Sequence, residues 1–288
     1  MTTRASTAFL ASEFPPAPPH TARFHVIPAP LEKTTSYAKG TAHGPAAILA
    51  ASQQLEAFNG RSCPGTYGIH TAAPILCRGS THTVLARIAR AVTSALHHRA
   101  VPALLGGEHT VTLGAVHALR AANIPFGIIQ FDAHADLRDA YEGSPYSHAC
   151  VMRRIVELSV PIVQIGVRAF SREEDSFRRA SRIPHFDAAQ LVTSALPRRL
   201  LPPNFPNLLY ITFDVDCFDP SLMPATGTPV PGGLSWYQTR TLLHRAVTGR
   251  TLIGFDVVEL APLPGLHAAD FTAAQLVYDL MALAAPPD

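Results

Sequence analysis

Two short motifs in this sequence carry acidic and imidazole side chains at a spacing that suits metal binding. The apolar run 127–131 leads into Asp132-Ala133-His134-Ala135-Asp136, and the run 208–213 leads into Asp214-Val215-Asp216. In an extended backbone, side chains two residues apart point to the same side, so each motif would present its ligands together. Buried carboxylates repel one another unless a cation compensates them. The motifs therefore predict the two sides of one metal cluster.

A third segment adds an imidazole to this expected cluster. The apolar run Val101–Leu105 is followed by Gly106-Gly107-Glu108-His109, in which the paired glycines allow a tight turn. A histidine taken alone more often packs or caps a helix, but at another strand end His109 becomes a candidate ligand. Carboxylates with few imidazoles and no thiolate suit manganese or a similar divalent ion better than a tetrahedral structural zinc. Two such ions, about 3.5–4 Å apart, can share a water and lower its pKa.

Other reactive side chains have simpler interpretations. Asp219, followed by Pro220, is out of phase with Asp214 and Asp216, so we expect it in a turn. The four cysteines are widely separated, which predicts free thiols rather than a zinc knuckle or a disulfide framework. Most of the 14 histidines are expected on solvated faces or in loops.

The elements that must position these motifs alternate between two patterns. Short β-branched runs predict strands, and the segments between them carry apolar residues at helical spacing, which is typical of a parallel sheet in an α/β fold. The expected strands are Phe24–Pro28, Val101–Leu105, Phe126–Phe131, Pro161–Ile165, Leu208–Phe213 and Thr251–Val258. The expected helices are Pro45–Phe58, Thr83–His98, Val111–Ala122, Ala149–Leu158, Trp236–Val247 and Thr272–Leu283. In such sheets ligands bind beyond the carboxyl ends of the strands, where the motifs lie.

Composition limits the domain organisation and the partners. With 288 residues and 47% hydrophobic content, residues 23–288 are expected to form one domain, and the proline-rich segment Leu196–Asn207 a loop within it. Residues 1–22, with clustered prolines, predict an irregular and partly disordered arm rather than a packed element. Mixed charges with a net charge of +2 argue against a nucleic-acid partner. No apolar stretch predicts a membrane span or a signal peptide, so we expect a cytoplasmic protein.

The ordered motifs of this chain resemble those of the ureohydrolase family, which contains arginase and agmatinase. The resemblance runs from about Pro28 to the last helix and implies a three-layer α/β/α fold with a central, mainly parallel sheet. Glu108 and Thr110 stand where aspartate and serine are frequent in the family, but no ligand is missing. The matching stretches are Gly106–His109, Asp132–Asp136, Ser147-His148, Asp214–Asp216 with Asp219-Pro220, Ala225–Pro229 and Asp256-Val257-Val258-Glu259.

The resemblance also implies a role for each site residue. One Mn²⁺ would be held by His109, Asp132, Asp136 and Asp214, and the second by His134, Asp132, Asp214 and Asp216. A bridging hydroxide would attack the guanidinium carbon, and the tetrahedral intermediate would collapse to urea and an amine. Glu259 would orient the guanidinium, His148 would pass a proton to the leaving amine, and Thr228 would support Glu259 or the substrate. The simpler alternatives are a surface carboxylate at Glu259, a helix cap at His148 and a turn at Thr228.

The loop Leu137–Ser147 favours agmatine as the small-molecule substrate, which would yield putrescine for polyamine biosynthesis. It lacks the asparagine and serine pattern of arginases and, with Gly227–Gly233, is similar to agmatinases. Guanidinobutyrate, guanidinopropionate, aminopropylagmatine and arginine remain alternative substrates. A catalytically silent binding or regulatory relative and a zinc-dependent deacetylase with one metal are alternatives of other classes. The resemblance implies a homo-oligomer, trimeric or hexameric.

Overall fold

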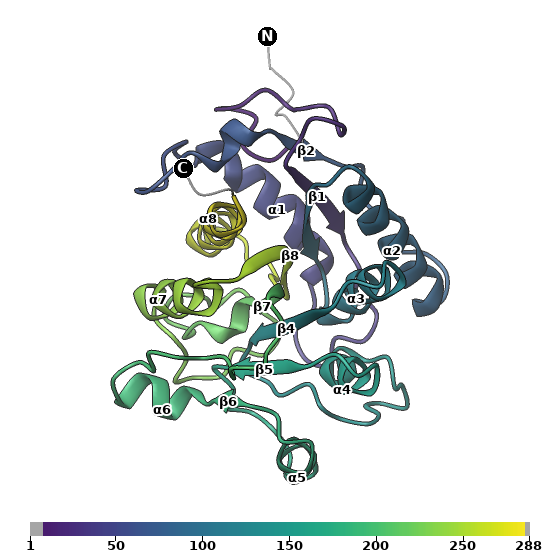
Figure 1. The fold of residues 1–288 in the computed structure, drawn as a ribbon, viewed down its shortest axis with the longest axis vertical. Coiled ribbons are helices and arrows are strands. Elements are labelled where there is room, and N and C mark those ends of the chain that lie inside the picture. The colour runs from purple at the N-terminus through teal and green to yellow at the C-terminus, as the bar shows by residue number, and fades with distance from the viewer. Residues whose placement is uncertain (1–7, 286–288) are drawn as a thin grey trace.

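A single sheet of eight strands forms the centre of the computed structural model, which describes residues 8–285 (Figure 1). The strands lie in the order β2-β1-β3-β8-β7-β4-β5-β6, and every pairing between them is parallel. The expected strands are confirmed, whereas the short β2 and β6 were not predicted. The bounds are β1 Phe24–Ala29, β2 Ile69–Thr71, β3 Val101–Gly106, β4 Phe126–Phe131, β5 Ile162–Ile165, β6 His185–Phe186, β7 Leu208–Asp214 and β8 Thr251–Val258.

Helices cover both faces of the sheet and complete the three-layer α/β/α fold that the sequence predicts. Figure 1 shows α1, α7 and α8 on one face and α2, α3 and α4 on the other. The predicted helices are present, while the charged α5 and the short α6 were not predicted. The bounds are α1 Gly44–Ala51, α2 Thr81–His97, α3 Thr112–Ala121, α4 Val151–Glu157, α5 Arg172–Ala180, α6 Ala188–Thr193, α7 Trp236–Val247 and α8 His267–Ala284. None of the helices in the described residues is long and apolar enough to cross a bilayer.

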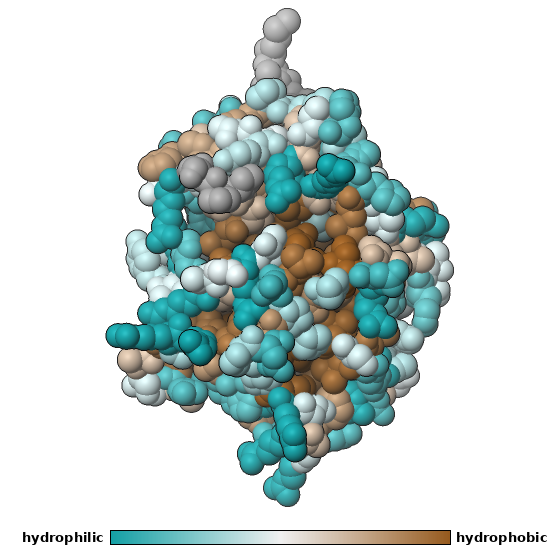
Figure 2. All heavy atoms as spheres, viewed as in Figure 1, coloured by the Kyte–Doolittle hydropathy of each residue, from teal (hydrophilic) through white to brown (hydrophobic). Residues whose placement is uncertain are grey.

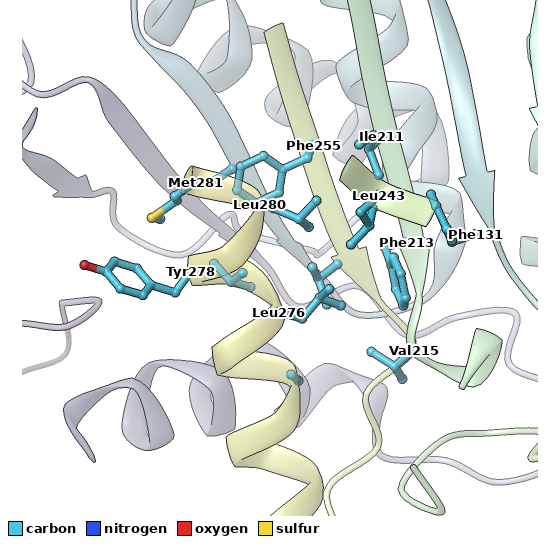
Figure 3. Packing of buried hydrophobic residues seen from close by; sticks show 14 of the residues in the cluster. Phe131, Ile211, Phe213, Val215, Leu243, Phe255, Leu276, Tyr278, Leu280 and Met281 are labelled. Atoms are coloured by element: carbon cyan, nitrogen blue, oxygen red, sulfur yellow. The ribbon is translucent and has the colours of Figure 1, made fainter. Parts of the chain in front are cut away.

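The sheet separates two hydrophobic layers. Figure 3 shows one of them, where Phe131, Phe213 and Phe255 from the strands meet Leu243 of α7 and Leu280 of α8. All five side chains are buried, and burial of each large apolar side chain contributes about 1.5–3 kcal/mol. On the surface, Figure 2 shows hydrophilic residues around the rim of the viewed face and hydrophobic residues gathered near its centre. Because the sheet is buried between the two hydrophobic layers, its strand ends provide fixed positions for the site.

The N-terminal arm is irregular, as expected, but it is not separate from the core. Its described part, residues 8–22, contains no helix or strand, yet Phe9 and Leu10 are buried. The Leu10 amide donates to Ser52 Oγ at 2.9 Å. The expectation of an unpacked arm is therefore wrong for this part. The clustered prolines disfavour a helix or strand, but burial of two adjacent large apolar side chains still stabilises the packed arm. Residues 1–7, where disorder was also expected, lie outside the described residues.

Three smaller expectations are confirmed. Residues 196–207 form a loop, and the four cysteines, all within the described residues, are free thiols. Asp219 holds a turn, since its carboxylate accepts the backbone amides of Ser221, Gly232 and Gly233 at 2.9–3.0 Å. These hydrogen bonds lower the pKa of Asp219 to about 2, the bonds from Ser221 most of all.

Candidate metal centre

The topology brings the predicted motifs to one edge of the sheet. Strands β3, β8, β7 and β4 are neighbours in that order, and all are parallel, so their carboxyl ends lie side by side. His109 follows β3, residues 132–136 follow β4, Asp214 ends β7, and Glu259 follows β8. Ligand sites of open parallel sheets form at this edge. Segments separated by up to 150 residues therefore meet at one place.

The six predicted ligands converge on a common point. Nδ1 of His109 lies 3.1 Å from Asp132 Oδ2, 3.0 Å from Asp136 Oδ2 and 3.6 Å from Asp214 Oδ2. On the other side, Nδ1 of His134 lies 2.9 Å from Asp216 Oδ2 and 3.6 Å from Asp132 Oδ1. The two oxygens of Asp132 thus face different imidazoles, as a bridging carboxylate requires. Two overlapping groups have ligand atoms within 4.8 Å of one another: His109, Asp132 and Asp214, and Asp132, His134 and Asp216.

Asp136 reaches the cluster by a route that the extended-strand argument misses. Its backbone has a φ of 53°, in the left-handed region that aspartate tolerates better than most residues. The strand conformation therefore does not continue from Asp132 to Asp136. The expectation that alternation alone aligns the whole motif is wrong, although the carboxylate still meets His109.

The hydrogen bond at Nε2 fixes a tautomer of neutral His109 that suits a metal ligand. Thr212 Oγ1 donates to Asp256 Oδ1 at 2.6 Å, so it accepts from Nε2 of His109 at 2.8 Å. In the neutral imidazole the lone pair is then on Nδ1, the atom surrounded by carboxylates. Without a cation, and against the effect of burial, Asp132 and Asp136 raise the pKa of His109 well above its usual range. Among the described residues, Nδ1 has no partner with hydrogen-bond geometry, although carboxylate oxygens lie about it. A buried nitrogen with its lone pair among carboxylates fits a bound cation.

Without a cation, several ionisable side chains of the cluster have pKa values that oppose the charge states of metal ligands. Burial raises the pKa of Asp214 well above its usual range, and the charges of Asp216 and Asp132 raise it further. Burial, with the charge of Asp132, raises the pKa of Asp136 to about 7. Against the effect of burial, Asp216 and Asp132 raise the pKa of His134 to about 12. Without a cation, the chain thus disfavours ionised Asp136 and Asp214 and a neutral His134, which are the states that bound divalent cations favour.

A row of buried polar side chains supports the ligands from below. Gln164, Gln130, Thr212 and Asp256 lie opposite one another on the neighbouring strands β5, β4, β7 and β8, and all are 0% exposed. Gln130 Nε2 donates to Asp132 Oδ2 at 2.8 Å, and Gln164 Nε2 donates to Gln130 Oε1 at 2.7 Å. We call these four residues the polar row. Sequence reasoning missed it, although a glutamine within the apolar run 127–131 was a visible signal.

The remaining predicted residues line a cavity of about 300 Å³ above the ligands. Glu259 is buried, and its Oε1 accepts the backbone N–H of His109 at 2.6 Å, which leaves Oε2 for a ligand. Burial raises the pKa of Glu259 well above its usual range. Burial, with the charges of His109 and His134, lowers the pKa of His148 to about 4. Thr228 also lines the cavity, so the structure brings every predicted site residue except the buried His109 and Asp132 to the cavity surface.

Several residues of the site had no signal in the sequence. Thr35, Ser36, Tyr37 and Ala38 form a wall of the cavity. Arg168 donates to the carbonyls of Asp216, Phe218 and Val230 at 2.7–3.1 Å and so fixes the chain beyond β7. These contacts join segments far apart in the chain, which a local pattern does not encode.

Comparison with known proteins finds the same fold and similar sequences. A family model described as the arginase family matches residues 22–283. An N(1)-aminopropylagmatine ureohydrolase from Synechocystis is 39% identical over 275 residues, covering 89% of this chain and 87% of the relative. An agmatinase from Pyrococcus horikoshii is 33% identical, covering 92% and 93%. The crystal structure of agmatine ureohydrolase from Thermoplasma volcanium superposes with a TM-score of 0.83 at 28% identity, covering 97% and 94%.

Proposed function

Since this chain belongs to the arginase family and is a ureohydrolase that acts on guanidino compounds, we propose N(1)-aminopropylagmatine as its substrate, with agmatine as the second candidate. Water would cleave the bond between the guanidinium carbon and the chain nitrogen, releasing urea and the corresponding triamine. This choice of substrate is supported by four relatives with this name, which are 35–39% identical over about nine-tenths of the chain. The agmatinase relatives are 33% and 30% identical, which keeps agmatine and its product putrescine as the alternative.

We propose that the aspartates and histidines hold two Mn²⁺ ions. The donor set fits, because carboxylate oxygens dominate, Asp132 faces both imidazoles, and Nδ1 of His109 has its lone pair among carboxylates. One ion would be held by His109, Asp132, Asp136 and Asp214, and the other by His134, Asp132, Asp214 and Asp216. When bound, the ions would lower the pKa of water and so supply the nucleophile.

The cavity residues supply orientation and proton transfer. Glu259 Oε2 would accept a charge-assisted hydrogen bond from the planar guanidinium, because Oε1 is occupied by the His109 amide. Thr228, which also lines the cavity, would hydrogen-bond the substrate. His148 would take up the proton that the attacking water loses and donate it to the amine nitrogen as the carbon–nitrogen bond breaks. The buried carboxylates would exclude a substrate whose reacting end is anionic.

A substrate panel tests the proposal. Metal-free protein is reloaded with Mn²⁺, and urea is measured with N(1)-aminopropylagmatine, agmatine, arginine, guanidinobutyrate and guanidinopropionate. We expect the highest kcat/KM for N(1)-aminopropylagmatine. A higher value for agmatine would select the alternative, and no urea from any compound despite bound metal would indicate a silent relative. Metal analysis should find two Mn²⁺ per chain, whereas one Zn²⁺ would favour a deacetylase-like site.

The family resemblance also supports a homo-oligomer, trimeric or hexameric, and we propose that it is cytoplasmic. Light scattering of the purified protein tests the oligomer, and cell fractionation tests the location. A monomer in solution would contradict this part of the proposal.

A further inference from the structure

A buried carboxylate next to the metal centre has no role in metal binding. Glu108 is 0% exposed, and its Oε2 accepts the backbone N–H groups of Lys33 and Thr34, both at 2.6 Å. A buried carboxylate is costly unless such donors compensate it. Among the described residues its Oε1 has no hydrogen-bond partner, so the two amides carry the compensation. Glu108 therefore fixes the backbone of a segment about 75 residues away in the chain.

Backbone hydrogen bonds also join the turn after β3 to the segment that follows β1. The Glu108 amide donates to the Leu31 carbonyl at 2.7 Å, and the Gly107 amide donates to the Ala29 carbonyl at 2.9 Å. A Cβ at Gly107 would lie 2.0 Å from the Leu31 oxygen, so only glycine permits this approach. The segment that leaves β1 is thus held against the turn that follows β3.

Thr34, held in this way, contacts His148. The Thr34 hydroxyl accepts the backbone N–H of His148 at 3.0 Å and lies 3.3 Å from its Nδ1, a distance that Ser147 Oγ shares. A hydroxyl oxygen has two lone pairs, so after accepting from the amide Thr34 Oγ1 can also accept the N–H of Nδ1. The neutral imidazole then has its lone pair on Nε2, where it can take up a proton and deliver it to the leaving amine. That nitrogen is left for the cavity, which His148 lines.

The residues after Thr34 form the cavity wall, and a second carboxylate fixes their far end. Glu32 Oε2 accepts the amides of Gly40 at 2.8 Å and Ala42 at 3.0 Å. Residues 35–38, between the two anchors, line the cavity, and Tyr37 is 81% exposed. Only the Glu108 anchor includes a contact with His148.

We propose that Glu108 and Thr34 are positioning residues for proton transfer: Glu108 fixes the Thr34 backbone, and the Thr34 hydroxyl holds the His148 backbone and, with Ser147 Oγ, the Nδ1–H tautomer, whose Nε2 lone pair can take up a proton and deliver it. The inference rests on the proposed function, because it assigns His148 the proton donated to the leaving amine. A purely structural role for the same contacts would stabilise the loop without acting through His148.

A double-mutant cycle separates these roles. Thr34→Val keeps the shape but removes the hydroxyl, and Thr34→Ser restores it. We expect Thr34→Val to lower kcat roughly tenfold to 100-fold, below the about 10²–10⁴-fold that proton transfer contributes, with KM nearly unchanged. Thr34→Ser should recover most of kcat. In a His148→Asn background, Thr34→Val should change kcat less than about twofold, because the interaction is already absent. Equal losses in both backgrounds would overturn the proposal.

The positioning role of Glu108 is tested against Glu32, the carboxylate that fixes the other end of the same loop. Glu108→Ala should lower kcat with two Mn²⁺ still bound, whereas Glu32→Ala, which frees the far end, should mainly raise KM. Loss of metal from Glu108→Ala, or the same KM effect in both variants, would contradict the assignment. Hydrogen exchange supplies a readout independent of activity, since the Lys33 and Thr34 amides should lose protection in Glu108→Ala. If the wild type makes no urea, the proposed function fails, while this exchange result still tests whether Glu108 fixes the Lys33 and Thr34 backbone.

Discussion

Thr212→Val removes one hydroxyl from the polar row, and its effect can be worked from the contacts. The hydroxyl accepts from His109 Nε2 and donates to Asp256 Oδ1, and all three residues are at most 1% exposed. Valine has nearly the same shape, so two buried polar groups lose a partner with little change in packing. Each such group costs about 1–3 kcal/mol. Since Tyr210 still donates to Asp256, we expect unfolding free energy to fall by about 2–4 kcal/mol.

The same chain offers a matched control. Thr239 is also 0% exposed, but within the described part of the chain its Oγ1 has no hydrogen-bond partner. Thr239→Val should therefore be neutral or stabilising, because it removes a buried polar atom that makes no bond. The assay is urea denaturation of both variants with Mn²⁺ in excess, followed by Mn²⁺ titration of the metal-free proteins. Affinity should fall about 10–100-fold for Thr212→Val only. Equal midpoints for the two variants would refute the reasoning.

Three further predictions follow from the site and from the Asp219 turn. His148→Asn should lower kcat by about 10²-fold or more while KM and Mn²⁺ content stay near wild type, and urea release measures this; loss of metal would contradict a role confined to proton transfer. Removal of Mn²⁺ with a chelator should lower the denaturation midpoint, since saturation at 100 times Kd contributes about 2.7 kcal/mol per site, and an unchanged midpoint would argue against buried metal sites. The folded pKa of Asp219, about 2, is below the usual aspartate value of 3.8, so its contribution to stability is present above pH 3.8 and is lost as pH falls toward 2. Asp219→Asn should therefore destabilise at pH 7 and progressively less below pH 4, measured by denaturant midpoints at each pH, and a pH-independent difference would contradict the hydrogen-bond cause.

The sequence predicts the central strands well because each is a near-continuous apolar run. Such runs are typical of strands buried on both faces, as in β4 and β7. β2 and β6, with three and two residues, are too short for any periodic signal. α5, with the sequence REEDSFRRA, has a single large apolar side chain, so its helical pattern carries no hydrophobic face. A capping box at Ser171 and Glu174 was the available signal for its start.

The residues of the candidate site likewise fall into those that the sequence predicts and those that it does not. Ligands that directly follow apolar strands, such as Asp132 and Asp214, could be predicted because the strand end fixes where they lie. Thr34 could not, since it reaches His148 through a contact across 114 residues. Glu108 was visible only as a departure from the family spelling, and its function depends on two amides from another segment. Local patterns specify which residues end a strand, whereas tertiary packing decides which loops return to them.

The polar row also has a consequence for how the chain folds. In parallel strands a slip of one residue would turn Gln130 or Thr212 to the opposite face, among the aromatic side chains around Phe131 and Phe213. A slip of two would restore the face but leave an amide or carboxylate opposite an apolar neighbour, without its hydrogen bonds. Hydrophobic contacts alone distinguish such alignments weakly, because the strands are apolar along most of their length. The groups that hold the ligands thus also select one alignment of four central strands during folding.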